Sequence, residues 1–534
     1  MENSVWDYII IGGGSAGCVL ANRLSARPDI KVLLLDAGAK DGALSLKIPA
    51  GLVSAIGDDR YNWKYPAKSD ASRGGTVELW SAGKAIGGGS AINGMFYTRG
   101  HRSDFDRWAQ AGCTGWDYES VLPHFRSLEA YEGGGDDYRG EAGPQPVTLA
   151  RHKLPVVDRI VQAACDVGHP FNPDYNGAHQ TGVGYAQASQ KNGRRMSSAT
   201  AFLDPVRKRS NLTILHKAHV TRIDFDGGRA VGVSFIQSGR TQRARCKGEI
   251  ILSAGAMGSP KLLMLSGIGP ADILAEHGIR MRHEAPDVGR NLMEHPAVYL
   301  TAKSEMKTLN AAAHPLRLPF VLADWLFRGR GPATSCAAVA QILCRRDRAH
   351  LAPDIQLLVT PAVFSYDEKK KKASVLPENG VSIAALILQP ESRGRIVLSS
   401  SDPLLPPMIE HELLAAESDL KGMILAARKA VELLTAPSLS DIIAPLDQRL
   451  TPDSSDEAYS DFIRQTAFRG DHASGTCRMG SDAASVLDPS LRVRGVTGLR
   501  VADASIMPSI TNGNTNAPTL MIAEKAASMI LSEA

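Results

Sequence analysis

Aromatic residues make up only 6% of this chain, and it holds just seven cysteines among 534 residues. The cysteines are odd in number and scattered, with no Cys-x-x-Cys pair and no Cys/His spacing that suits zinc. This pattern argues against a disulfide framework and against a bound metal. It fits a reducing compartment, and we therefore expect a cytoplasmic protein.

Long hydrophobic runs are missing as well, since no uninterrupted apolar stretch reaches the ~18 residues expected of a membrane-spanning helix. Residues 1–7 lead directly into an apolar strand, which leaves no room for the regions of a signal peptide. The net charge of +4 is small, and its basic residues are spread along the chain. We expect neither a transmembrane segment nor a nucleic-acid partner.

The remaining composition is that of an ordinary globular protein, with 43% hydrophobic and 22% charged residues. The length exceeds the usual range of one compact domain, so two closely packed domains are expected. Residues 5–11 predict a buried strand, residues 16–26 a helix and residues 31–35 a second buried strand. This order within about 30 residues predicts a βαβ unit and a parallel sheet.

The turn after the first strand carries the pattern Gly12-x-Gly14-x-x-Gly17. These glycines allow a tight turn, close approach of a pyrophosphate to the backbone, and close packing of helix on strand. Asp36 ends the second strand about 20 residues further on, where it suits an adenosine ribose. The pattern predicts dinucleotide binding, but NAD and FAD share the ADP half that it recognises.

Six blocks further along the chain resemble, in family order, the signatures of the glucose-methanol-choline (GMC) oxidoreductases, in particular choline dehydrogenase-like proteins and primary-alcohol oxidases. They are residues 83–95 (GKAIGGGSAINGM, followed by Arg99-Gly100), 255–269 (GAMGSPKLLMLSGIG), 287–296 (DVGRNLMEHP), 472–480 (HASGTCRMG), 501–508 (VADASIMP) and 514–519 (NTNAPT). The resemblance therefore extends from residue 5 to the end of the chain.

The resemblance implies an α/β fold, in which a Rossmann-like FAD-binding domain is joined by a discontinuous α+β substrate-binding domain. We expect the FAD-binding domain to comprise residues 1–150, 190–298 and 485–534. Residues 151–189 and 299–484 would form the substrate-binding domain. The two family regions themselves would span about residues 5–298 and 388–526.

The implied cofactor is FAD, and we expect it to be non-covalent. Some relatives attach FAD through a histidine at the position of Ile92, and isoleucine cannot form that bond. Ala82 and Gly89 also depart from the residues usual in the family. By pattern or by similarity, the expected cofactor contacts are Gly12, Gly14, Ser15, Ala16, Gly17, Asp36, Ala37, Gly87, Gly88, Ser90, Asn93, Gly94, Met95, Val220, Asp503 and Ala504. Among these, Asn93 and Met95 would line the flavin ring.

The resemblance places the chemistry on His472 and Asn514. Alcohol oxidation needs a base with a pKa near the working pH, and imidazole suits that task. His472 stands at the family's base position, and Asn514 would donate to the developing alkoxide. We interpret His295, in the third block, as structural. The roles of Arg195 and Ser197 stay open.

The residues just before the base differ from the aromatic residue common in relatives, and are Gly470 and Asp471. We expect both to face the substrate. A carboxylate there favours a polar alcohol, while the alternative is that Asp471 pairs with Arg469. Gly470 would leave room for oxygen.

The predicted function is FAD-dependent hydride removal from an alcohol, most simply a primary and polar one, giving an aldehyde. The acceptor is oxygen, a quinone or another carrier, with a dehydrogenase slightly favoured over an oxidase of aryl, furfuryl or pyridoxine type. Alternatives on the same fold are a hydroxynitrile lyase, a photodecarboxylase or a nucleotide-binding protein without catalysis. The oligomeric state stays open.

Overall fold

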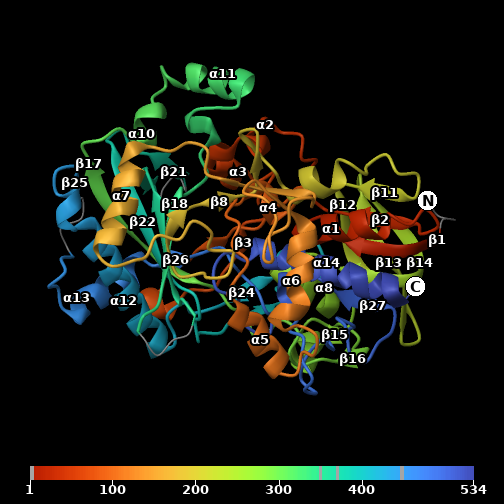
Figure 1. Ribbon diagram of the computed structural model, residues 1–534. Helices are drawn as coiled ribbons and strands as arrows, with labels where there is room; N and C mark the ends of the chain where they lie inside the picture. The colour runs from red at the N-terminus through yellow and green to blue at the C-terminus, as the bar shows by residue number, and fades with distance from the viewer. Residues whose placement is uncertain (1–4, 348–351, 368–371, 446–449, 534) are drawn as a thin grey trace.

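The structure is a computed structural model that describes residues 5–347, 352–367, 372–445 and 450–533. Two large sheets lie side by side in Figure 1, and the two ends of the chain lie on the same side of the molecule. Each sheet has its own apolar core of buried side chains. The α/β fold expected from the sequence is therefore confirmed.

The first sheet is seven-stranded and runs in the order β11-β2-β1-β14-β13-β12, with β27 also paired to β14. Its strands are β1 (Val5–Ile11), β2 (Val32–Leu35), β11 (Leu212–Leu215), β12 (Ala218–Asp226), β13 (Arg229–Gln237), β14 (Arg240–Leu252) and β27 (Leu499–Val501). Strands β11, β2, β1, β14 and β27 are parallel, while β12 and β13 form an antiparallel extension. The parallel strands are almost continuously apolar because both of their faces are covered.

Helices pack around this first sheet: α1 (Ser15–Leu24), α6 (Tyr118–Leu128), α8 (Gly255–Leu265) and α14 (Asn516–Glu533). The C-terminal α14 lies against α1, which follows the first strand. The start and the end of the chain thus share one core, because residues of both helices belong to the same buried cluster.

The second sheet is seven-stranded and antiparallel, in the order β25-β17-β22-β19-β18-β7, with β26 paired to β17. Its strands are β7 (Gly182–Tyr185), β17 (Pro296–Ser304), β18 (Ala340–Cys344), β19 (Ile355–Thr360), β22 (Gly380–Ile387), β25 (Ile443–Pro445) and β26 (Phe468–Arg469). Its helices are α7 (Pro155–Asp166), α12 (Glu417–Leu434) and α13 (Asp456–Thr466). Helix α12 covers β22 and β17, and it begins with acidic residues that suit the positive end of a helix dipole.

Smaller elements lie in the connections between these strands and helices. The helical ones are α2 (Leu44–Lys47), η1 (Pro49–Gly51), α3 (Leu52–Gly57), η2 (Ala71–Arg73), α4 (Gly89–Ile92), α5 (Arg102–Gln110), η3 (Ala199–Leu203), α9 (Ala271–Glu276), α10 (Leu309–Ala312), α11 (Leu318–Arg328), η4 (Pro332–Thr334), η5 (Pro437–Leu439) and η6 (Ala504–Ile506). The strands are β3 (Tyr65–Pro66), β4 (Leu79–Trp80), β5 (Glu129–Tyr131), β6 (Gln145–Leu149), β8 (Gln187–Ala188), β9 (Gln190–Lys191), β10 (Arg194–Arg195), β15 (Ile268–Gly269), β16 (His283–Glu284), β20 (Phe364–Asp367), β21 (Lys372–Val375), β23 (Arg395–Val397) and β24 (Met408–Glu410).

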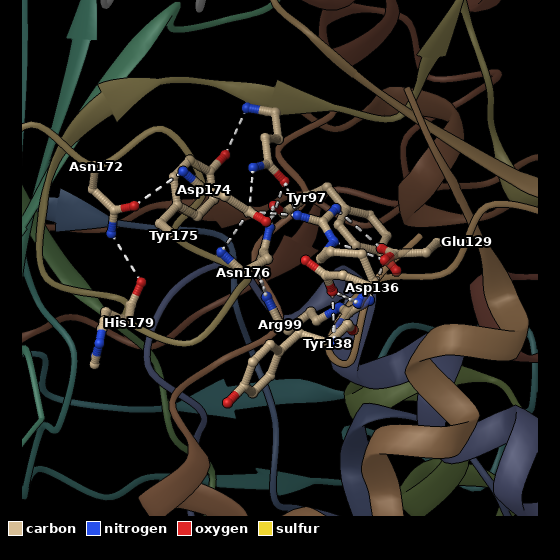
Figure 2. A network of polar contacts seen from close by, with 12 residues as sticks. Tyr97, Arg99, Glu129, Asp136, Tyr138, Asn172, Asp174, Tyr175, Asn176 and His179 are labelled. Atoms are coloured by element: carbon tan, nitrogen blue, oxygen red, sulfur yellow. Dashed lines mark hydrogen bonds and ion pairs between the residues drawn. The ribbon is translucent and has the colours of Figure 1, made fainter. Parts of the chain in front are cut away.

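A buried charge network ties several of these connections together (Figure 2). The Glu129 carboxylate at the start of β5 accepts from the guanidinium groups of Arg99 and Arg139, and all three side chains are at most 2% exposed. Arg139 also reaches Asp174 at 2.5 Å, so two cations face two carboxylates. Asn176 continues the network by donating to the Tyr97 carbonyl at 2.8 Å. The network joins the segment just after the glycine-rich block of residues 83–95 to the loop before β7.

Candidate functional site

The turn between β1 and α1 has the strained geometry that its glycines predict. Gly12 has a φ of +99°, and a Cβ there would lie 2.4 Å from the Ser253 carbonyl oxygen. A Cβ on Gly17 would lie 1.9 Å from the Gly12 oxygen, so α1 approaches the turn too closely for any side chain. Both positions require glycine because only glycine accepts this backbone and this packing.

The N-terminus of α1 has the features of an anion site. Its N-cap, Gly14, has no side chain to bond the first N–H groups of the helix. A Cβ on Gly14 would have no neighbour closer than 3.8 Å, and one on Gly89 would meet nothing within 4 Å. Side chains at these two glycines would fill the space over the helix terminus. The residues present therefore fit the diphosphate of a dinucleotide such as FAD, which a helix N-terminus binds through N–H groups and its dipole.

Asp36 stands where β2 ends, beside the same turn. Its carboxylate accepts from the Gly13 N–H at 2.7 Å and from the Gly38 N–H at 2.6 Å. These bonds hold the acid at the end of the sheet, where the sequence predicts a ribose contact. Val220 lies on the edge strand β12, where it pairs with Phe235 on one side only.

The second glycine-rich run packs directly on the first. The Gly87 N–H donates to the Gly13 oxygen at 2.7 Å. Gly88 has a φ of +52°, and its Cβ would lie 2.7 Å from Gly14 Cα. Ser90 donates to the Gly87 oxygen at 2.6 Å, which closes this turn. Segments far apart in the sequence are thus brought together around the start of α1.

The expected cofactor contacts differ in how accessible they are. Gly12, Gly14, Ser15, Asp36, Ala37, Asn93, Gly94, Val220 and Ala504 keep partial exposure, whereas Ala16, Gly17, Gly87, Gly88, Ser90, Met95 and Asp503 are buried. The Met95 side chain packs in the core of the second sheet, so it does not line an open face. Asp503 bonds the Gly255 N–H at 2.8 Å and thereby holds the start of α8.

Arg195, whose role the sequence left open, contacts this region. Its guanidinium donates to the Asn93 carbonyl oxygen at 2.6 Å and to the Asn93 side-chain oxygen at 2.9 Å. The side chain is buried, and burial lowers its pKa to about 10, so it stays charged at neutral pH. Arg195 therefore fixes Asn93. Ser197, also left open, bonds Thr200 at the start of η3.

His472 and Asn514 meet as the sequence analysis expected, although 42 positions separate them. Asn514 Nδ2 lies 2.9 Å from His472 Nε2. Asn514 comes just before α14, and Asn516 at the start of that helix donates to Ser15 Oγ at 2.9 Å. The pair is thus anchored to the same turn that forms the dinucleotide site.

His295 contacts the other nitrogen of the His472 ring, with 2.9 Å between the two Nδ1 atoms. His295 Nε2 lies 3.1 Å from the Leu388 carbonyl oxygen, which can only accept. His295 must therefore carry its proton on Nε2, which leaves Nδ1 to accept from His472. It follows that His472 carries its proton on Nδ1 and presents the lone pair of Nε2 toward Asn514.

Burial keeps both imidazoles neutral. It lowers the pKa of His472 to about 4. The pKa of His295 lies well below its usual value because of burial and then because of repulsion from His472. Two neutral rings can form the donor–acceptor pair just described, whereas two imidazolium ions could not. At neutral pH the arrangement provides an unprotonated nitrogen at His472 Nε2.

Three further residues lie around the pair, and the sequence assigned no role to any of them. The Glu294 carboxyl accepts from the backbone N–H groups of His295 and His472, both at 2.8 Å. Burial, with the nearby Asp471, raises the pKa of Glu294 to about 8. Gln356 on β19 donates to Asn514 Oδ1 at 3.5 Å and to Gln341 at 2.6 Å, so it orients the Asn514 amide. Glu294 lies in the block of residues 287–296 that resembles the family. Gln356 and Gln341 come to the site through the pairing of β19 with β18 in the second sheet.

Gly470 serves a different purpose from the one expected. A Cβ there would lie 2.8 Å from His472 Nδ1 and 3.2 Å from its Cε1. The space that a side chain on Gly470 would occupy is already filled by the His472 ring. Gly470 therefore leaves no room for oxygen there, and that expectation is wrong. Glycine is needed here so that His472 can reach His295.

Asp471 forms the ion pair that the sequence analysis gave as its alternative. Its Oδ1 lies 2.8 Å from Arg469 Nε, and Arg469 also binds Glu78 at 2.7 Å. The Asp471 side chain nevertheless remains 43% exposed. Its φ of +60° is rare for a residue with a side chain and holds the turn before His472 in one conformation.

Family models described as GMC oxidoreductase match residues 6–297 and 390–523 of the chain. An alcohol dehydrogenase [acceptor] from Pseudomonas putida is 39% identical over 99% of this chain and 96% of its own length. The mitochondrial choline dehydrogenase of Homo sapiens is 38% identical over 98% of this chain and 89% of its own.

Solved structures of two oxidases are similar to this chain over nearly its whole length. A pyridoxine 4-oxidase from Mesorbium loti superposes with a TM-score of 0.88 at 30% identity, covering 98% of each chain. A formate oxidase from Aspergillus oryzae, studied for its FAD modification, superposes with a TM-score of 0.91 at 25% identity, covering 100% of this chain and 99% of its own.

Proposed function

Because the chain belongs to the GMC oxidoreductase family and is an FAD-dependent enzyme acting on alcohols, we propose that His472 is its catalytic base and Asn514 its partner. The observation that carries the proposal is the contact of His472 Nε2 with Asn514 Nδ2 at 2.9 Å, with His295 on the opposite side of the ring. The lone pair of the base and an amide donor thus lie side by side, bonded to each other, where a substrate hydroxyl could take the place of their bond.

The chemistry follows from this geometry. A substrate hydroxyl that replaces the direct Asn514–His472 hydrogen bond gives its proton to His472 Nε2, while the Asn514 amide donates to the alcohol oxygen. FAD, when bound, supplies the acceptor for the hydride of the carbinol carbon, and the product of a primary alcohol is an aldehyde. Asn514 offsets the negative charge that develops on oxygen during proton removal. Because asparagine does not titrate, the proton belongs to His472.

FAD would be held by the turn from Gly12 to Gly17, by Asp36 and by Gly87 to Asn93, with the remaining expected contacts around them. We propose non-covalent attachment, since Ile92 is buried and its hydrocarbon side chain cannot form a bond to a flavin. Within the proposed division into two domains, the parallel sheet would carry the cofactor and the antiparallel sheet the substrate. The boundary near residue 485 stays part of this proposal, and Cys477 and Met479 just before it also pack with the first core.

The finer proposal is a primary, polar alcohol, oxidised with an acceptor other than oxygen. Asp471 supports the polarity, because part of its side chain stays exposed at the position next to the proposed base. The name of the Pseudomonas putida relative, an alcohol dehydrogenase [acceptor], supports the acceptor. Relatives named oxygen-dependent choline dehydrogenases keep oxygen as the alternative.

The test is anaerobic bleaching of the flavin in the purified holoenzyme with choline, aliphatic, aryl, sugar and pyridoxine-type alcohols, followed by admission of air. We expect bleaching with at least one class and slow recovery of the yellow colour in air. Changing His472→Ala should lower the bleaching rate by at least about 100-fold while the flavin stays bound. Bleaching at the wild-type rate in this variant would remove His472 as the base, and no bleaching with any alcohol would favour a lyase.

A further inference from the structure

Helix α11 projects from the rest of the molecule and exposes large apolar side chains to solvent. Figure 1 shows it at the top, away from both sheets. Six large apolar side chains on or just before it are exposed to solvent: Leu316, Leu318, Phe320, Leu322, Leu326 and Phe327. Phe327 is 82% exposed and Phe320 76%. Such a concentration within twelve residues marks an interaction surface, since soluble proteins scatter their exposed apolar residues singly.

The helix is nevertheless firmly attached by its opposite side. Trp325 is 2% exposed and donates from its ring N–H to the Gly193 oxygen at 2.7 Å. It packs against Ile48 and Ala333. At 100° per residue, Phe320 and Phe327 lie seven residues apart on one face, opposite Trp325. The outward face of α11 is therefore held in place and directed at the surroundings.

The charged residues around this face are mainly basic. From residue 307 to residue 331 the chain carries four Lys or Arg and only one acidic residue. Arg317 precedes the helix, while Arg328 and Arg330 stand at its end, and all three are exposed. The acid, Asp324, pairs with Arg328 at 3.5 Å. A short helix with exposed apolar residues and with cations at both ends fits the headgroup region of a bilayer.

The length of the helix decides between lying on a membrane and crossing it. Its 11 residues span about 16 Å, roughly half of the hydrocarbon thickness. Among the described residues no helix is both long and apolar enough to cross a membrane. We propose that α11 docks the protein on an anionic lipid surface, with Phe320 and Phe327 inserted among the acyl chains and the flanking arginines at the headgroups.

The test is flotation of the full-length holoprotein with vesicles of phosphatidylcholine alone and of phosphatidylcholine with phosphatidylglycerol. We expect tighter binding to the anionic vesicles, weakened by salt because headgroup attraction is screened. Phe320→Ser with Phe327→Ser should lower the partition coefficient by at least about tenfold. Arg317→Gln with Arg330→Gln should reduce binding to anionic vesicles only.

The control is Val77→Ser with Leu404→Ser, which removes two exposed apolar side chains elsewhere on the surface and should leave partitioning unchanged. Melting temperature and bound flavin, measured for every variant, establish that each one folds. Equal partitioning of the wild type and the Phe320/Phe327 variant would overturn the proposal. So would light scattering that shows a dimer dissociated by these substitutions without any binding to vesicles, because the face would then belong to a second copy of the chain.

Discussion

At the scale of single residues, a backbone carbonyl group determines which ring nitrogen of His472 carries the proton, and it does so through His295. The Leu388 oxygen fixes the proton of His295, and His295 in turn fixes the proton of His472. The free lone pair of His472 therefore does not depend on a neighbouring carboxylate, which is the more common way to select a histidine tautomer. These contacts support a role for His295 in positioning the His472 proton, beyond the structural role expected from the sequence.

Replacement of His295 tests this arrangement. His295→Leu leaves the Nδ1–H of His472 without an acceptor and allows the wrong tautomer, so kcat should fall by about 100-fold with little change in KM. His295→Gln offers a side-chain oxygen in nearly the same place and should recover much of the loss. Steady-state kinetics of both variants provide the measurement. Equal kcat values for the two would mean that the tautomer is set in another way.

Asp471 allows a test of the substrate's charge. If its exposed carboxylate faces the substrate, Asp471→Asn should lower kcat/KM about tenfold more for a cationic alcohol than for a neutral one of the same shape. Asparagine tolerates a positive φ, so the turn itself should survive the change. The measurement is kcat/KM for such a matched pair. An equal effect on both would assign Asp471 to its ion pair with Arg469 alone.

At the scale of elements, the buried network around β5 uses charge where apolar packing is more usual. Removing one partner of a buried ion pair leaves an uncompensated charge, at a cost of about 3–5 kcal/mol. Arg139→Met should therefore lower the free energy of unfolding by about that amount, as measured by denaturant titration. The matched control is Glu119→Gln, which breaks the exposed pair with Arg102 and should have almost no effect. A similar change in both variants would mean that the network contributes little.

The elements also explain which parts of the protein the sequence predicts. Residues 5–11 form β1 as expected, and α1 and β2 agree within about two residues, because a glycine turn between apolar runs is a strong local signal. Gln356 and the Leu388 carbonyl were not predicted, since they reach the site through pairing of β19 with β18 and β22. Such pairings join residues far apart in the chain and leave no local pattern. The contact of Gly470 with His472 is local, and it is missed for a different reason: it depends on the turn at Asp471, whose φ is +60°.

At the scale of the whole molecule, buried neutral histidines predict sensitivity to acid. His411 lies outside the site and packs against Trp80, and burial lowers its pKa to about 4. Its charged neighbours are Asp70, Arg73, Arg393 and Glu78. Because the unfolded chain takes up the proton near pH 6.5, stability is full above that pH and falls as the pH drops toward 4.

The measurement is the free energy of unfolding at about pH 7 and about pH 5. His411 should account for about 2 kcal/mol of the loss between them, and His411→Phe should remove that part. His314→Gln changes an exposed histidine and should leave the pH dependence as it is. If the two variants had the same pH dependence, His411 would have to be protonated in the folded protein.

The bond between Asn516 and Ser15 joins positions 501 residues apart. During synthesis on the ribosome, the strand and turn at the beginning of the chain emerge long before Asn514, the proposed partner of the base. Early capture of the yellow coenzyme would therefore produce a coloured but inactive nascent protein. With the proposed base and partner, oxidation of alcohols would begin only once the last helix has left the exit tunnel and docked.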